Sequence, residues 1–252
     1  MELLAIKVPL IRPGDDLVSI FLEEIAKQGI SIRDQDIIVI SSKIVAMMQK
    51  RVVRLASIKP SHRAKTLSKE LNLDSRLMEL ILKESNHVYG GIPKLLLTLK
   101  YNLITPNAGI DLKNAPMGFV ALLPLKPFEV ASSIKEEIFK RVGKNVGVII
   151  VDSRINPLRM GTTGMAIGVA GFDPVVDYRG KKDLYNKPIS FTRHSMADDL
   201  ASAAHALMGE ANERIPIAIV RDAPVKVKGK KVDPESMEIS KEECLFSRAF
   251  RL

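Results

Sequence analysis

Two unbroken apolar runs constrain the fold of this chain more than any other feature of its sequence. They are residues 37–40 (IIVI) and 146–151 (VGVIIV), and neither alternates with polar side chains. Runs of this kind are typical of strands that are buried on both faces of a sheet. The first run stops at 41–42 (Ser-Ser) and the second at 152–153 (Asp-Ser), so we expect polar side chains where each strand ends.

Helical patterns lie between and beside these runs. Leu17, Phe21 and Ile25 share one face of a helix that begins after Asp15 or Asp16. Further helices are expected twice between residues 59 and 85, at about 131–142, and at 198–208, where Gly209 ends the helix. Further strands are expected at 3–8, 95–104 and 215–220. This order predicts an α+β fold, with a mixed or antiparallel sheet flanked by helices and a smaller second lobe.

Composition restricts the class of protein. The chain has 252 residues, a formal net charge of +9, 5% aromatic residues, one cysteine and no tryptophan. Few rings are available to stack on bases, so we assign the charge first to a solvated surface, next to small anionic ligands and last to nucleic acid. No apolar run approaches the roughly 20 residues that span a bilayer, and the first residues lack the pattern of a signal peptide. The predicted compartment is the cytoplasm.

Three carboxylates follow turns or the ends of predicted elements. Asp111 follows the tight turn at 105–109, Asp152 follows a strand, and Glu210 follows the end of a helix. Hard divalent cations such as Mg²⁺ prefer oxygen ligands of this kind, and Ser153 adds another oxygen. These side chains are candidates for one metal centre, whereas the alternative is that they only cap helices or form Asx turns.

Other polar positions are open to two interpretations. The glycines at 161, 164, 168 and 171 allow the backbone to approach either a phosphate or a packed neighbour, and no P-loop or Rossmann motif decides between them. Lys43 either contacts a phosphate or is solvated. His194 and His205 are assigned as hydrogen-bonded partners near the alanine-rich helix, because no motif indicates covalent catalysis.

Taken together, seven segments resemble the F420-0:gamma-glutamyl ligase family in order and spacing: 11–17, 36–45, 107–114, 146–153, 164–168, 179–183 and 208–210. The resemblance covers about residues 5 to 222, and its most specific part is the N-A-G-I-D-x-x-N box at 107–114. It implies a GTP-dependent ligase that adds L-glutamate in amide linkage to the lactyl carboxylate of coenzyme F420-0, a phosphodeazaflavin, through an acyl phosphate. It also implies Mg²⁺ or Mn²⁺, a monovalent ion such as K⁺, and an intertwined homodimer.

The resemblance also assigns residues to roles. Asp111 and Asp152 correspond to ligands of one metal ion, and Ser153 and Glu210 to ligands of the other. The positions that correspond to nucleotide contacts are Val8, Pro9, Leu10, Ile11, Ser42, Lys43, Asn114, Met208, Gly209, Glu210, Ala211, Asn212, Glu213, Arg214 and Ile215. The family fold implies two interlocked lobes within residues 1–225, which leaves 226–252 as a peripheral charged segment.

Several positions depart from the family pattern. Met47 stands where a lysine is common, Asp222 stands where glycine is usual, and the run at 152–161 keeps Arg159 and Gly161 but lacks the first glycine and arginine of the pattern. These changes surround the predicted metal set without altering it. Two alternatives therefore accompany the ligase prediction: a ligase that uses another carboxylate acceptor, and a nucleotide-binding protein without catalytic turnover.

Overall fold

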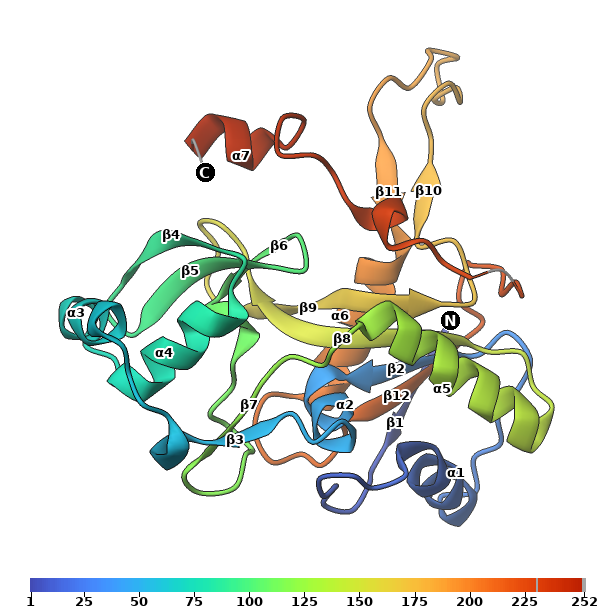
Figure 1. Cartoon of the computed structure of the whole chain (residues 1–252). Coiled ribbons are helices and arrows are strands. Elements are labelled where there is room, and N and C mark those ends of the chain that lie inside the picture. Colours follow the sequence, from blue (N-terminus) through green and yellow to red (C-terminus); the bar gives the residue numbers. More distant parts are fainter. Residues whose placement is uncertain (230, 251–252) are drawn as a thin grey trace.

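The core of the protein is a mixed sheet of five strands. The computed structural model describes residues 1–229 and 231–250. The strands lie in the order β1 (Glu2–Ile6), β12 (Ile217–Arg221), β2 (Ile37–Ser41), β8 (Gly147–Ile155) and β9 (Thr162–Ala170) (Figure 1). Only β2 and β8 pair in parallel, and the other three pairings are antiparallel. The α+β class and the mixed sheet are therefore confirmed.

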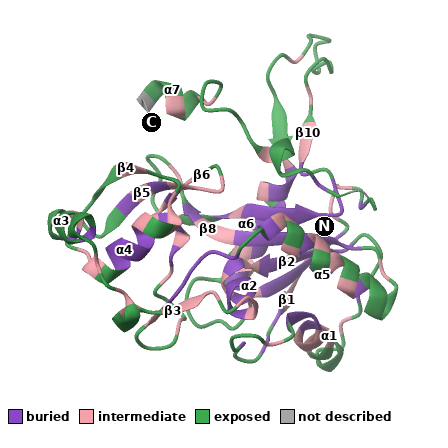
Figure 2. Ribbon diagram, viewed as in Figure 1, coloured by how far each residue is buried: buried purple, intermediate pink, exposed green. Residues whose placement is uncertain are grey.

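Helices cover both faces of this sheet, which explains why its central strands show no polar alternation. Ile38 and Ile40 pack on one face, against α1 (Leu17–Lys27) and α5 (Pro127–Val142). Ile37 and Val39 pack on the other face, against α6 (Met196–Met208). Figure 2 shows the buried strands between these helices. Burial on both faces is the property that the two apolar runs predict.

A segment with its own core is inserted between β2 and α5. The helix α2 (Ser42–Met48) leads into β3 (Val52–Arg54), which pairs with the returning strand β7 (Phe119–Ala121). Between these two strands lie η1 (Leu55–Ser57), α3 (His62–Glu70), α4 (Ser75–Glu84), β4 (His87–Ile92), β5 (Leu95–Lys100), β6 (Leu103–Pro106) and η2 (Asn107–Gly109). Leu77, Met78, Ile81 and Leu96 form the centre of a separate apolar cluster there. We call residues 55–118 the insert.

Two further segments extend from the main sheet. The strands β10 (Val175–Asp177) and β11 (Arg193–Ser195) form an antiparallel arm that projects away from the sheet (Figure 1). The chain beyond β12 includes η3 (Pro234–Met237) and α7 (Leu245–Phe250). Val227 and Val232 are buried on the α6 side of the sheet, whereas residues 233–249 are exposed or half-buried. The predicted peripheral segment therefore begins with two residues of the core.

The boundaries of several elements differ from those expected; β1 ends at Ile6 rather than at residue 8, and α6 begins at Met196 rather than at residue 198. α5 begins at Pro127 rather than near 131, because proline fits the first turn of a helix, where its missing N–H is not needed. β8 runs on to Ile155, so Asp152 lies within the strand rather than after it. The glycine-rich run forms β9, where a Cβ atom at Gly164 would lie 2.7 Å from the carbonyl oxygen of Ala201 in α6. At this glycine the structure favours close packing over a phosphate contact.

The start of α1 allows a first prediction. Asp16 accepts hydrogen bonds from the backbone N–H groups of Val18 and Ser19, both at 3.1 Å, and from Arg141 at 2.9 Å. Hydrogen bonds from Ser19, followed by the one from Arg141, lower the pKa of Asp16 to about 2. We expect Asp16→Ala to lower the free energy of unfolding by about 1 kcal/mol, the usual value of an N-cap. Urea unfolding measures this loss, and Glu23→Ala, which removes an exposed carboxylate within α1, is the control.

The same contact has a defined pH dependence. A carboxyl whose folded pKa is lowered stabilises the fold above its unfolded pKa, and this contribution is lost as the pH falls through the folded value. The difference between the wild type and Asp16→Ala is therefore present at pH 7 and shrinks between about pH 4 and pH 2. A difference that stays constant across this window contradicts the assignment.

Candidate functional site

A cavity of about 690 Å³ opens between the main sheet and the insert. Five separate segments and Thr162 of β9 line it, the segments lying within 8–13, 41–47, 105–116, 151–153 and 205–216. Every site residue expected from the sequence lies on its wall, namely Val8, Pro9, Leu10, Ile11, Ser42, Lys43, Asp111, Asn114, Asp152, Ser153, Met208, Gly209, Glu210, Ala211, Asn212, Glu213, Arg214 and Ile215. The fold thus brings these positions together, and their binding roles stay predictions.

One group of polar side chains in the cavity surrounds Asp152. The chain passes directly from β2 into α2, so Ser42 and Lys43 lie in the first turn of that helix beside the neighbouring strand β8. Ser42 donates a hydrogen bond of 2.7 Å to Asp152, and Lys43 forms a 2.6 Å ion pair with Asp111. Asp111 belongs to the insert, and its backbone pairs with Ala121 of the returning strand β7. This group therefore joins the main sheet to the insert.

A second polar group lies on the opposite face of β8. Ser153 Oγ lies 2.9 Å from His205 Nε2 in α6, and the same nitrogen lies 3.2 Å from Glu210 Oε1. Thr162 donates a hydrogen bond of 2.6 Å to Glu210. Successive strand residues point to opposite faces, so Asp152 joins the α2 group and Ser153 joins the α6 group. The two groups contain the same pairs of residues that the family resemblance assigns to two metal ions.

Backbone contacts join the remaining segments of the wall. Asn114 donates a side-chain hydrogen bond of 2.8 Å to the carbonyl oxygen of Ala211, and the N–H of Val8 donates to the carbonyl oxygen of Arg214 at 3.1 Å. Gly209 ends α6 with a φ of 70°, and a Cβ atom there would lie 2.3 Å from Cδ of Glu213. The loop after α6 needs a glycine at this position.

Comparison with known proteins decides the family. Residues 5–222 match the family model described as F420-0:Gamma-glutamyl ligase. The chain belongs to this ligase family. A similar protein from Methanococcus maripaludis (strain C7), named Coenzyme F420:L-glutamate ligase, is 38% identical over 226 residues, which cover 89% of each chain. A relative of the same name from Archaeoglobus fulgidus is 34% identical over 244 residues, which cover 97% of this chain and 95% of the relative.

Membership of this family makes the chain an enzyme of the acid–amino-acid ligase class. The resemblance noted from the sequence motifs is confirmed over the residues from which it was drawn. Among the residues that the structure describes, no helix is both long enough and apolar enough to cross a membrane.

The charges in the ligase cavity are partly removed from water. Burial raises the pKa of the Asp152 carboxyl, and the nearby Asp111 carboxylate raises it further, against the opposite effects of Arg154 and Ser42. Burial also raises the pKa of Glu210, but hydrogen bonds from Thr162 and Ser153 outweigh it and leave the pKa below its ordinary value. The two acidic groups therefore stand in different electrostatic surroundings.

The donor atoms fit hard divalent cations. Carboxylate oxygens from Asp111, Asp152 and Glu210 and the hydroxyl of Ser153 are the ligand types that Mg²⁺ and Mn²⁺ prefer. In the described part of the chain no three Asp, Glu, His or Cys side chains converge at metal-ligand spacing. The carboxylates thus form two groups within one cavity rather than a single cluster, and phosphate oxygens of a nucleotide can complete such sites in ligases.

His205 is a hydrogen-bonded partner beside this site, as its sequence context predicts. Two further polar residues beside the site, Thr162 and Arg154, are not indicated by any sequence motif, and Thr162 lies in the glycine-rich run. Arg154 follows Asp152 by two residues on the same face of β8, is only 2% exposed, and places its Nε 3.2 Å from Asp152 Oδ2. The strand period of two residues is the signal that places Arg154 beside Asp152.

Proposed function

We propose that this enzyme is a GTP-dependent ligase that joins L-glutamate in amide linkage to the lactyl carboxylate of coenzyme F420-0. The observation that carries the proposal is the cavity itself, because two groups of acidic and hydroxyl side chains face it together with the segments that correspond to nucleotide contacts. Its volume lies within the range typical of ligand sites. The names of relatives that are 34% to 38% identical support coenzyme F420 and L-glutamate as the two groups that are joined.

The chemistry requires activation of a carboxylate. A carboxylate is a poor electrophile, so we propose that it attacks the γ-phosphorus of GTP, forms an acyl phosphate and releases GDP. The amine of glutamate then attacks the acyl carbon and displaces phosphate. Lys43 and Lys113 line the cavity and can neutralise phosphate charge, while Asp111, Asp152, Ser153 and Glu210 would hold Mg²⁺ or Mn²⁺. Bound divalent ions would supply charge neutralisation on the transferred phosphoryl group.

The direct test is product formation. Purified enzyme incubated with GTP, Mn²⁺, L-glutamate and F420-0 is expected to give a mono- or diglutamyl product and to release one phosphate for each amide bond formed. Mass spectrometry measures the product, and a coupled assay measures phosphate. Mixtures without glutamate or without F420-0 are the controls, and ATP in place of GTP tests the nucleotide. Absence of amide product under all these conditions contradicts the proposal.

A second candidate keeps the ligase chemistry but changes the acceptor. Met47 lines the cavity where the family commonly has a lysine, and Asn156 in the following loop replaces an arginine of the pattern. Met47 in place of a lysine removes a positive charge from the cavity wall, and Asn156 in place of an arginine removes a second one from the loop after β8. A screen of other carboxylate acceptors for glutamate-dependent phosphate release separates the two candidates. If GTP binds in calorimetry but no mixture releases phosphate, the chain is instead a non-catalytic nucleotide-binding protein.

Assembly and compartment complete the proposal. We propose a homodimer, because the β10–β11 arm exposes the apolar residues Leu184, Tyr185 and Phe191 away from the main sheet. Large exposed apolar side chains of this kind mark protein interfaces. We also propose that the enzyme acts in the cytoplasm with its nucleotide substrate. Sedimentation at equilibrium measures the mass of the assembly, and a monomer across the micromolar range contradicts the dimer.

A further inference from the structure

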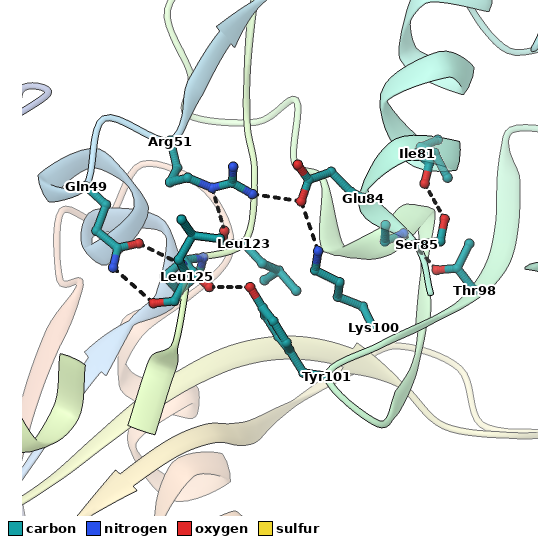
Figure 3. Close-up of polar contacts among 12 residues, drawn as sticks. Gln49, Arg51, Ile81, Glu84, Ser85, Thr98, Lys100, Tyr101, Leu123 and Leu125 are labelled. Carbon is teal, nitrogen blue, oxygen red and sulfur yellow. Dashed lines mark hydrogen bonds and ion pairs between the residues drawn. The ribbon is translucent and has the colours of Figure 1, made fainter. Parts of the chain in front are cut away.

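A polar cluster outside the cavity links the insert to the main sheet. It consists of Gln49, Arg51, Glu84, Lys100 and Tyr101, which we call the Glu84 cluster (Figure 3). Gln49 and Arg51 precede β3, whereas the other three residues belong to the insert.

The Glu84 carboxylate is the centre of this cluster. Arg51 Nη2 lies 2.7 Å from Glu84 Oε2, and Lys100 Nζ lies 3.0 Å from the same oxygen. The three side chains are only 12% to 18% exposed. Two cations therefore share one carboxylate in a region with little water, where removal of the carboxylate leaves like charges facing each other.

The same side chains bind residues 123–125, which follow the returning strand β7. Arg51 Nε donates to the carbonyl oxygen of Leu123 at 3.2 Å, and Tyr101 donates to that of Pro124 at 2.9 Å. Gln49 and Leu125 exchange two hydrogen bonds of 2.7 and 3.0 Å. The two chain segments that connect the main sheet to the insert are therefore hydrogen-bonded to each other and to the insert itself.

A short path of backbone hydrogen bonds leads from this cluster to the cavity. The N–H of Leu122 donates to the carbonyl oxygen of Arg51 at 3.0 Å, and Ala121 exchanges two hydrogen bonds of 2.9 Å with Asp111. The N–H of Arg51 donates to the carbonyl oxygen of Ala46 in α2 at 2.8 Å. α2 begins with Ser42 and Lys43, which contact Asp152 and Asp111. The path through α2 therefore also leads to Asp111, at the Lys43–Asp111 ion pair.

We propose that Arg51 and Glu84 are positioning residues that hold Asp111 of the insert against Lys43 and Asp152 of the main sheet. This role rests on the proposed function, in which Asp111 would be a ligand for a divalent ion. Neither residue lines the cavity, so both act through the backbone hydrogen bonds that link Arg51 to Leu122, Ala121 and Asp111 on one side and to α2 on the other. The position of Asp111 relative to Lys43 and Asp152 is then determined by an ion-pair cluster that lies outside the cavity.

Hydrogen–deuterium exchange of the ligand-free protein gives the first test. Glu84→Gln is expected to speed exchange at the amides of Asp111, Ala121 and Leu122 by at least about tenfold, because these hydrogen bonds open more often, while the peptide covering α1 is unchanged. Glu129→Gln is the matched control, since Glu129 pairs with Lys126 on the exposed surface of α5. Unchanged exchange at the three amides overturns the proposal, whether or not the protein proves to be a ligase.

Binding of Mn²⁺ alone gives the second test. Glu84→Gln is expected to weaken the affinity measured by electron paramagnetic resonance by about tenfold, as loss of an outer-shell partner does. Arg51→Lys keeps a cation opposite Glu84 and is expected to restore most of this affinity relative to Arg51→Met. Tyr101→Phe removes only the hydrogen bond to Pro124, and it replaces Glu84→Gln in both tests if that variant does not fold. It is expected to speed exchange at the same amides and to weaken the affinity for Mn²⁺. Wild-type exchange and affinity in the folded variants overturn the proposal.

Discussion

Asp111→Asn is expected to lower kcat by about a thousandfold, the scale on which one electrostatic contact in a transition state acts. Asparagine has the shape of aspartate and keeps an oxygen that can accept the 2.7 Å hydrogen bond from the N–H of Lys113. It removes the charge that pairs with Lys43 and that would bind a divalent ion. Product formation with GTP, Mn²⁺, glutamate and F420-0 measures the loss.

Stability separates this effect from a folding defect. The Lys43 and Asp111 side chains are 24% and 36% exposed, so their ion pair contributes at most about 1 kcal/mol to folding. The unfolding midpoint of Asp111→Asn should therefore stay near that of the wild type. Asp199→Asn, on the exposed side of α6 and 2.5 Å from His194, makes the same chemical change outside the cavity and should keep full activity. An Asp111→Asn enzyme that retains more than a tenth of wild-type kcat contradicts the role of this carboxylate.

Asp36→Asn is expected to cost about 3 to 5 kcal/mol of the free energy of unfolding, the usual result of breaking a buried ion pair from one side. Asp36 is 1% exposed and Arg221 is 6% exposed. Arg221 donates two hydrogen bonds of 3.0 and 2.9 Å to the carboxylate, across the start of β2 and the end of β12. Loss of the Asp36 charge leaves the buried guanidinium with only a distant, exposed counter-charge, since Glu2 Oε2 lies 3.9 Å from Arg221 Nη1. Urea unfolding followed by circular dichroism measures the difference.

Two further variants identify the cause. Asp34→Asn removes an exposed carboxylate that accepts a 2.8 Å hydrogen bond from Asn145, and it should cost less than about 1 kcal/mol. Replacing the pair together, as Asp36→Leu with Arg221→Met, should be nearer to the wild type than Asp36→Asn, because no charge remains buried. If the double variant is the less stable of the two, the loss at Asp36 comes from packing rather than from the unpaired arginine.

Local patterns predicted much of the main sheet and its helices. The strand at 37–40 was clear because an apolar run without glycine or proline has few other conformations, and α1 was clear because Asp16 precedes a periodic apolar face. β9 was missed, since its glycines are rare in strands and are needed here only because α5 and α6 approach closely. The approach of these helices to β9 depends on the tertiary fold, so no local sequence pattern predicts it.

The sequence predicted which residues belong to the site, but not which of them contact one another. The family motifs indicated Asp111, Asp152 and Glu210, and strand alternation explains why Asp152 and Ser153 face different helices. The partners of these residues come from tertiary contacts; Ser42 and Asp152 are 110 positions apart in the chain. The pairing of Arg51 with Glu84 likewise depends on how the insert folds back, which no spacing in the sequence encodes.

The place of β12 in the sheet has a consequence for how the protein is made. This strand lies between β1 and β2, so β1 has no partner until residues 217–221 have been made. Until then β1 and the facing edge of β2 stay unpaired in the nascent chain, and pairings between residues so far apart form slowly. Premature termination before residue 217 would release polypeptides that lack β12 and so cannot complete the sheet. Such polypeptides would be prone to edge-to-edge aggregation and to degradation.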